Sequence, residues 1–338
     1  MALPAAARVT GWRMEIRCVT ADGVHRYGAD QLASLPTENA VLWVDVPQWD
    51  AAAAAVLTER FGIHPRAAED CARRNPVPKV HVYPGHAFIV LHGPEKGARG
   101  HIHYLELDQF VGPDWVVTVH GPLNPAVSPD AALAETRAVA RRLESGRLHP
   151  ASGAELSFAI TSALSGRLRD QLATMTEEVW RLERRVTGGD DGDPEQFLEE
   201  MFAARHGLLA VWTMAALSRE VFGRMATLGV WPEAGGGLLL DAEDQFRRLS
   251  RMAESQREYL QGVIEFFQAR TGTKMTIAAE RLAVIAAVTL PITALSSVLG
   301  MNVIVNTHTH VVALVVLLVV MAVMSAALLW WSKRRGWW

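Results

Sequence analysis

Fifty consecutive residues, from Leu282 to Trp331, contain no Asp, Glu, Lys or Arg. They form two apolar segments of 18 and 21 residues, 282–299 and 311–331, joined by the uncharged residues 300–310. A helix needs roughly 20 apolar residues to cross the hydrocarbon core of a bilayer. We therefore expect a first transmembrane helix over 282–299, an outer loop over 300–310, a second transmembrane helix over 311–331 and a basic tail over 332–338.

The charges that flank these segments predict how they lie in a membrane. Basic residues precede the first segment and follow the second, whereas the connecting loop has none. The positive-inside rule then places both termini in the cytoplasm and residues 300–310 outside. The first residues, MALPAAARVTGWR, lack the basic and apolar regions of a signal peptide. We expect a plasma-membrane protein with a cytoplasmic N-terminal region.

The composition before Leu282 is that of an ordinary charged soluble region. It holds 30 basic and 36 acidic residues, a formal net charge of −6, and we expect no nucleic-acid partner. Cys18 and Cys71 are too few for a disulfide framework and are expected to be buried thiols. The sequence contains no Walker motif, nucleophile elbow or zincin motif, so we expect neither a bound nucleotide nor an enzyme.

Local patterns predict the elements of the cytoplasmic region. Short runs that alternate or are continuously apolar and end at Gly or Pro turns predict strands at Val41–Val46, Ala87–His92, His101–Leu107 and Trp115–His120. Helices are expected at Ala51–Phe61 and from Pro65, which gives an α/β domain over 1–125. A helical region over 126–240 follows, with helices at Pro129–Ser145, Ala154–Thr187 and Pro194–Leu228.

A further helix is expected to begin near Asp241 and to form a stalk over 241–281 that continues into the first span. Residues at alternating three- and four-residue steps mark a packing seam on this stalk: Phe246, Leu249, Ala253, Gln256, Leu260, Val263 and Phe267.

The first apolar segment differs from the second in having hydroxyl side chains and a proline. Thr289, Thr293, Ser296 and Ser297 recur at three- and four-residue steps and so share one face of a helix, near Pro291. A polar face inside a membrane contacts water or protein, as in a pore-lining helix. The alternative is ordinary helix packing through small residues. The second segment has the character of a lipid-facing helix.

Two blocks resemble the CorA family of magnesium channels. One is the loop LGMNVIVNTHTH, with Pro291 and Thr293 at the family's spacing before it. The other is FGIHPRAAEDCARRNPVPKVHVYPGHAFIVLHG, residues 61–93. The resemblance implies an α+β cytoplasmic domain, a long helical stalk that continues into a two-helix transmembrane region, and a homopentameric funnel. It also implies passive Mg²⁺ influx driven by the membrane potential, with Co²⁺ or Ni²⁺ as further cargo.

The resemblance assigns roles to particular residues. A ring of Gly300, Met301 and Asn302 would select the hydrated ion at the outer end of the pore. Intracellular Mg²⁺ bound to the cytoplasmic domains would close the channel, and Glu265 is the candidate ligand, with a plain surface charge as the alternative. The positions implied to line the pore are Ala279, Leu282, Leu290 and Thr293.

The chain also departs from the family pattern around the filter. Leu299 and Val303 replace aromatic residues, and the loop has no Glu. It carries His308 and His310 instead, a weak candidate for an outer metal site, with a neutral polar loop as the alternative. These changes keep transport of Zn²⁺ or another divalent metal open as the second hypothesis. A membrane-anchored helical scaffold or sensor is the third.

The cytoplasmic region has a similar His-x-His pair. His101 and His103 share one face of a predicted strand, and this pair is expected to be a surface or structural feature rather than a metal-binding one.

Overall fold

The computed structural model describes residues 14–35, 39–97, 100–122, 124–189, 192–231, 233–303 and 311–334. The chain divides into two compact units, one ending at Gly262 and the other beginning at Val263. The first unit contains a mixed sheet with helices on both faces, and the second contains the apolar helical segments.

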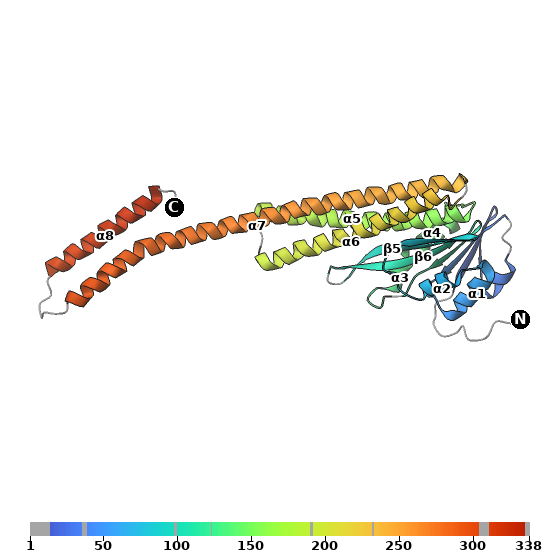
Figure 1. Ribbon diagram of the computed structural model, residues 1–338, viewed down its shortest axis with the longest axis horizontal. Coiled ribbons are helices and arrows are strands. Elements are labelled where there is room, and N and C mark those ends of the chain that lie inside the picture. Colours follow the sequence, from blue (N-terminus) through green and yellow to red (C-terminus); the bar gives the residue numbers. More distant parts are fainter. Residues whose placement is uncertain are drawn as a thin grey trace. The chain divides into compact units, whose positions relative to one another are not determined.

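The first unit is built on a seven-stranded sheet of order β2-β1-β3-β7-β6-β5-β4. Figure 1 labels β5 and β6 in this sheet. Neighbouring strands are antiparallel except for β3 and β7, which are parallel. The strands span Glu15–Thr20 (β1), Gly23–Tyr27 (β2), Val41–Val46 (β3), Lys79–Tyr83 (β4), His86–Lys96 (β5), Ile102–Val111 (β6) and Trp115–Val119 (β7).

The predicted strand at Val41–Val46 is confirmed, and β5 and β6 extend beyond the predicted ranges. The sequence analysis missed β1, β2 and β4. β2 and β4 are the two edge strands of the sheet. Polar residues interrupt their sequences, GVHRY and KVHVY, because only one neighbour covers each strand and much of its surface faces solvent.

Two short helices, α1 (Ala51–Phe61) and α2 (Pro65–Cys71), cover one face of the sheet over a buried apolar cluster. The predicted bounds of α1 are confirmed because both ends carry strong local signals. The Asp50 carboxylate accepts a hydrogen bond from the backbone N–H of Ala53 at 2.7 Å, which caps the first turn. Gly62 ends the helix in the left-handed conformation, with φ of 63°.

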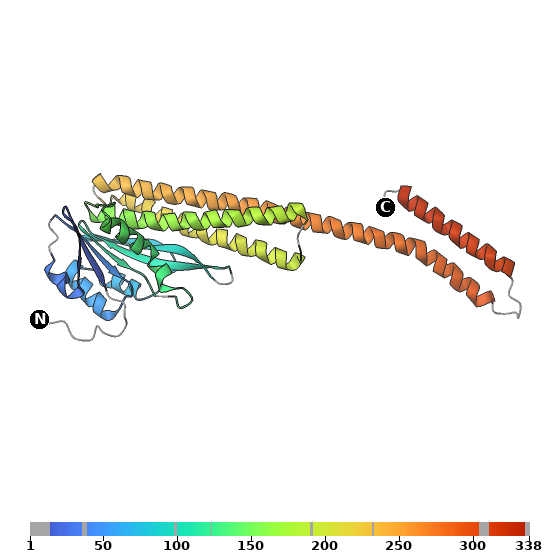
Figure 2. The ribbon, with the colours of Figure 1, turned by 180° about the vertical axis from the view of Figure 1, so that it is seen from behind.

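The other face of the sheet is covered by longer helices, which Figure 2 shows from behind. They are α5 (Gly153–Gly188) and α6 (Pro194–Leu228), preceded by α3 (Pro129–Ala132) and α4 (Ala134–Glu144). The predicted single helix over Pro129–Ser145 is wrong, because it breaks at Leu133, whose φ and ψ are −98° and 9°. The predicted bounds of α6 are confirmed, with Asp193 as its N-terminal cap.

One continuous helix, α7, runs over 71 residues from Glu233 to Val303, and α8 spans Val311–Arg334. Within the first unit α7 packs against α5 and α6: the rings of Phe246 and Phe222 stack at 5.6 Å, and Ser165 donates to the Gln245 side chain. The apolar residues of the predicted seam are all buried. α7 begins eight residues before the predicted start at Asp241. The three glycines at 235–237 have low helix propensity, so the sequence did not predict its first turns.

Candidate ion pathway and its geometry

The four residues expected to line a pore lie on one stripe of α7. At about 100° per residue, Ala279, Leu282, Leu290 and Thr293 fall within about 80° of the helix circumference. All four are exposed in the single chain, and Leu282 and Leu290 each leave 66% of their surface uncovered. The stripe is therefore a continuous surface that the rest of this chain leaves bare.

On the opposite side of the same segment, cover is local to one residue. Val284 is only 3% exposed, and it lies about 160° around α7 from the centre of the stripe, whereas Ile277 on that side is 43% exposed. The helix therefore packs within the chain at Val284, while the stripe stays available for water, lipid or further copies of the chain.

Hydroxyl groups line the edge of the stripe and bond to their own helix. Thr289 donates to the Ile285 carbonyl and Thr293 to the Thr289 carbonyl, each at 2.8 Å. These bonds use the hydroxyl hydrogens and leave the oxygen lone pairs as acceptors that point away from the backbone. Pro291, inside the helix, has no N–H for the carbonyl of Ala287, which adds a further uncommitted oxygen within the helix. Such acceptors suit the waters of a hydrated cation.

Gly300, Met301 and Asn302 belong to the last turn of α7, which ends at Val303 rather than at Leu299 as the sequence indicated. The last four carbonyl groups of an α-helix have no partner within the helix. They also form the negative end of the helix dipole, equivalent to about half an elementary charge. The end of α7 therefore presents backbone oxygens and negative potential at the Gly-Met-Asn residues. His308 and His310 lie outside the described residues.

The candidate metal-binding residues in the charged part of the chain do not form one cluster. Glu265 is exposed on α7, next to the buried Ile264. Asp70, within the 61–93 block, pairs with Lys79 at 2.6 Å. Over the described ranges, no three His, Cys, Asp or Glu side chains converge in a geometry that would hold a metal ion.

The sequence analysis missed a buried polar network inside the first unit. His120 Nε2 lies 2.9 Å from the Asp45 carboxylate, its Nδ1 lies 2.9 Å from the Ala132 carbonyl, and Thr118 donates to Asp45. Burial favours a raised pKa for Asp45, but the charge and hydrogen bond of His120 outweigh it and lower the pKa. An acidic residue inside an apolar strand, VLWVDV, was the signal available in the sequence.

A second buried group lies on β6, where the sequence LELDQF again places acids inside an apolar strand. Asp108 is fully buried, and Glu106 beside it accepts two hydrogen bonds from Asn75. Burial and then the neighbouring Glu106 raise the pKa of Asp108 well above its usual range. This pair is a feature of the domain core and lies on a different element from the stripe.

Two helices among the described residues are long and apolar enough to cross a membrane, with windows in 235–297 and 315–334 of mean hydropathy 1.6 and 2.3. The sequence model of the CorA-like Mg²⁺ transporter proteins matches residues 38–334. The chain belongs to the CorA-like Mg²⁺ transporter family. It is thus a membrane protein that transports divalent metal ions, and it is not an enzyme.

Other comparisons agree with CorA membership. The chain is 24% identical over 266 residues to YfjQ of Bacillus subtilis (strain 168), a protein provisionally assigned as a metal ion transporter, covering 77% of this chain and 78% of that one. Its fold is similar to the complete CorA magnesium transporter of Methanocaldococcus jannaschii, with a TM-score of 0.78, 13% identity and coverage of 98% and 100%.

Two further solved structures share the fold. The full-length CmaX protein matches with a TM-score of 0.75 and 17% identity, over 98% of this chain and 100% of that one. The ZntB cytoplasmic domain of Vibrio parahaemolyticus RIMD 2210633 matches with a TM-score of 0.60 and 12% identity, over 79% and 99%. The expected fold is confirmed as a mixed α/β N-terminal domain, a long stalk helix and two apolar C-terminal helices.

Proposed function

We propose that this CorA-family transporter is a passive Mg²⁺ influx channel of the plasma membrane, with Co²⁺ and Ni²⁺ as further cargo. It would act as a homopentamer with both termini in the cytoplasm and residues 300–310 outside. The observation that carries the proposal is the end of α7, which presents the carbonyl end of a helix dipole at Gly300, Met301 and Asn302.

The chemistry of Mg²⁺ favours such a site. Mg²⁺ loses its waters reluctantly and prefers oxygen ligands, so a filter that contacts the hydrated ion avoids the cost of stripping it. In five copies, the Asn302 amide oxygens and the last carbonyls of α7 would accept hydrogen bonds from the ion's waters. Five converging helix C-termini would supply the negative potential that the acid-free loop lacks. The thioether of Met301 is a soft group and would serve packing rather than binding.

The stripe on α7 would form the pore wall behind this filter. Thr293 would offer a hydroxyl oxygen to the hydrated ion, while Leu290 and Leu282 would form apolar constrictions that close by excluding water. The small side chain of Ala279 would keep the pore wide at its inner, cytoplasmic end. The exposure of all four residues supports this arrangement, because a pore wall is left bare when a single chain is considered.

The membrane potential supplies the driving force in this proposal. A charge gains about 2.3 kcal/mol per 100 mV, so a divalent ion entering a negative interior gains about 4–5 kcal/mol. Intracellular Mg²⁺ would close the channel by binding to the cytoplasmic unit, with Glu265 as the candidate ligand. α7 extends without a break from the seam to the filter. A movement of the seam would therefore be transmitted along the helix to the constrictions at Leu282 and Leu290.

Replacing Asn302 tests the filter. Asn302→Ala should abolish Mg²⁺ uptake into proteoliposomes while the oligomer still assembles, because the ring of amide oxygens is gone. Asn306→Ala, four residues further along the loop, is the matched control and should retain uptake. Wild-type uptake by the Asn302 variant would remove this residue from the filter.

Flux measurements decide between the ions. Uptake of Mg²⁺, Zn²⁺, Co²⁺ and Ni²⁺ should be compared in the same proteoliposomes, with Mg²⁺ flux expected to persist at physiological concentrations of the others. Zn²⁺ flux without Mg²⁺ flux would replace the proposal with the zinc-transport hypothesis, which His308 and His310 favour by their chemistry. Absence of all four fluxes in an assembled, membrane-inserted protein would leave the scaffold or sensor hypothesis.

A further inference from the structure

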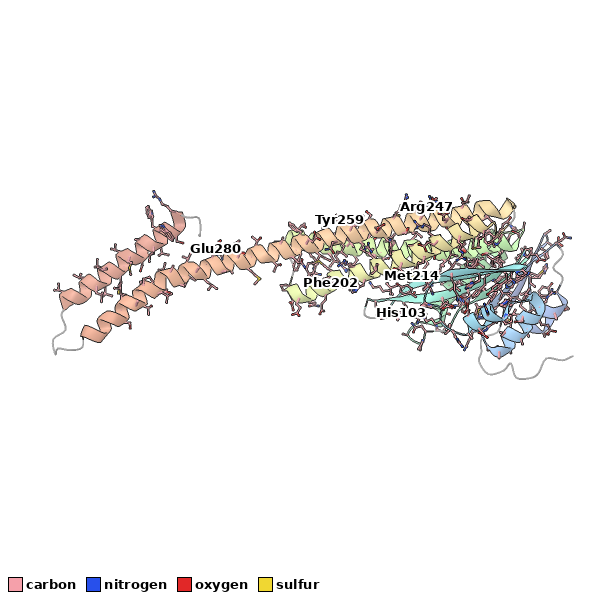
Figure 3. All side chains as sticks on the ribbon, viewed as in Figure 1. His103, Phe202, Met214, Arg247, Tyr259 and Glu280 are labelled. Carbon is pink, nitrogen blue, oxygen red and sulfur yellow. The ribbon has the colours of Figure 1, made fainter. Side chains whose placement is uncertain are left out.

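The strongest unassigned cluster lies at the turn that joins β5 to β6, within the first unit. His101 precedes β6 and His103 is its second residue, and their Nε2 atoms face each other at 3.0 Å. The ring centroids are 4.3 Å apart and the planes cross at 79°. Figure 3 labels His103 on this hairpin.

Two nitrogen atoms at this separation have the spacing of neighbouring ligands on one metal ion. Two metal–imidazole bonds of about 2.0–2.1 Å place their nitrogens about 2.8–3.0 Å apart at the 90° angle of square-planar Cu²⁺ or Ni²⁺ sites, and about 3.3–3.4 Å apart at the tetrahedral angle of Zn²⁺. Without a metal, one hydrogen must lie between the two rings. We propose that His101 and His103 form a binding site for a divalent transition-metal cation of borderline softness, Zn²⁺, Ni²⁺ or Cu²⁺, with water as the remaining ligands.

Gly97 keeps the space between the two rings open. A Cβ atom at this position would lie 2.6 Å from His101 Nε2 and 2.8 Å from His103 Nε2. The backbone N–H of Gly97 donates to the His101 carbonyl at 2.8 Å, which holds the glycine opposite the first imidazole. The absence of a side chain here therefore leaves a small gap that both nitrogens face, and any other residue would fill it.

Asn124 holds the second imidazole and controls which nitrogen carries the hydrogen. Its amide oxygen accepts from the backbone N–H of Ala126 at 3.0 Å, so its amide nitrogen faces His103 Nδ1, at 3.1 Å. In this arrangement His103 carries its hydrogen on Nε2 and donates it to His101. Metal binding moves that hydrogen to Nδ1 of His103, and the Asn124 amide rotates to accept it. The exposed N–H of Ala126 then bonds to water.

The site is selective by the chemistry of its ligands. Neutral imidazole suits Zn²⁺, Ni²⁺ and Cu²⁺, whereas Mg²⁺ takes oxygen ligands and keeps its waters. The inference therefore does not depend on which ion passes through the membrane.

Calorimetric titration of the full chain in detergent tests the site. A background variant, His308→Ala with His310→Ala, removes the other His-x-His pair. After chelator treatment it should bind one Zn²⁺ per chain at this site and should not bind Mg²⁺ there. His101→Ala and His103→Ala should each remove this binding, whereas His25→Ala, which alters an exposed histidine on β2, should not. Electron paramagnetic resonance of bound Cu²⁺ should show coupling to two imidazole nitrogens.

Two variants that keep both histidines sharpen the test. Asn124→Asp offers one oxygen to Ala126 and another to the His103 Nδ1 hydrogen, and should raise Zn²⁺ affinity about 10-fold. Misfolding would not produce such a gain. Gly97→Ala fills the gap and should lower affinity at least 10-fold, within the range expected for a disturbed ligand shell. Binding that survives in His101→Ala and His103→Ala, or that His25→Ala reduces equally, would show adventitious metal only and overturn the proposal.

Discussion

The two units of this protein differ in how much of their apolar surface a single chain buries. In the unit that ends at Gly262, large apolar side chains such as Trp43 and Phe88 are fully buried. In the two apolar windows that could span a membrane, only 6% of the residues are buried. The first unit buries its apolar side chains in a core of its own, whereas the second has an apolar surface that lipid or further copies of the chain must cover. Exposed leucines in the second unit are therefore contact surface rather than packing defects.

Hydroxyl groups bond both across the fold and within single helices. On the sheet, Thr118 donates to Asp45, which is 73 residues away in the chain. On helices of both units, threonine hydroxyls donate to a carbonyl four residues earlier, as at Thr213 in the first unit and at Thr289 in the second. Such local bonds would satisfy a hydroxyl in hydrocarbon, where no water is present, but they also occur in helices outside the apolar windows.

The largest effect is expected where the core of the first unit holds a buried carboxylate that is hydrogen-bonded to a histidine. His120→Ala should destabilise the protein by about 3–5 kcal/mol, because it leaves the Asp45 carboxylate buried without its partner. Arg137→Ala, which breaks the exposed pair with Asp130, is the control and should cost at most about 1 kcal/mol. Thermal unfolding of the full chain in detergent measures both. Equal losses would mean that the network does not support the core.

A lysine placed on an exposed leucine should distinguish the two surfaces. Leu318→Lys in α8 should cost about 2.5–3.5 kcal/mol of membrane insertion if that side contacts lipid. Leu209→Lys in α6, at a leucine that is 40% exposed, should change stability by less than about 0.5 kcal/mol. The fraction of protein inserted in membranes checks the first change. Full insertion of the Leu318 variant would contradict the lipid-facing assignment of α8.

A methyl group at a close backbone contact should disturb the first unit. A Cβ at Gly153, the first residue of α5, would lie 2.2 Å from the Gly112 carbonyl oxygen and 2.8 Å from that of Trp115. Gly153→Ala should therefore cost about 1–3 kcal/mol. Gly166→Ala, in the same helix, meets only the Arg169 side chain at 3.6 Å and should gain up to about 1 kcal/mol. The sign of the difference in melting temperature tests the contact.

The smallest effect is a change in pH dependence at Asp108. Its pKa is raised in the folded state, so folding retains a proton that the unfolded chain loses. This contribution to stability is present below the unfolded pKa and is lost as pH rises toward the folded pKa. Asp108→Asn should therefore improve the melting temperature relative to wild type more at pH 8 than at pH 5. If the melting temperatures of Asp108→Asn and wild type differ equally at pH 5 and pH 8, the effect does not come from the raised pKa of Asp108. The same trend in the exposed Asp22→Asn would also exclude that cause.

Much of the fold could be predicted from local signals. α1 and α6 begin at Asp50 and Asp193, which cap the first turn, and end at glycines in the left-handed conformation. Glycine also misled the prediction at both ends of α7: helix continues through Gly235 and through Gly300, where local propensity indicates a start or a loop. At Gly235, which is buried, tertiary packing outweighs the propensity of one residue, and packing is not visible in a local pattern.

The site was predictable only as a pattern. The spacing of the residues from Ala279 to Thr293 predicts that they share one face of a helix. It does not predict that this face is exposed in the single chain while Val284 is buried. The partners of the polar residues were not predictable either. His120 meets Asp45 across 75 residues, and Asn124 meets His103 across 21. Such pairs arise from the order of strands in the sheet, which the sequence does not state.

The continuity of α7 restricts how its length can vary. Phe267 ends the buried seam and Ala279 begins the stripe, and both lie on one helix. Each residue added between them turns everything beyond it by about 100° and advances it by about 1.5 Å. One extra residue would rotate the proposed pore wall away from the axis, whereas seven would return it to within about 20°. The coding sequence of this part of α7 can therefore gain or lose codons only in numbers that restore the helical phase, such as seven, eleven or eighteen.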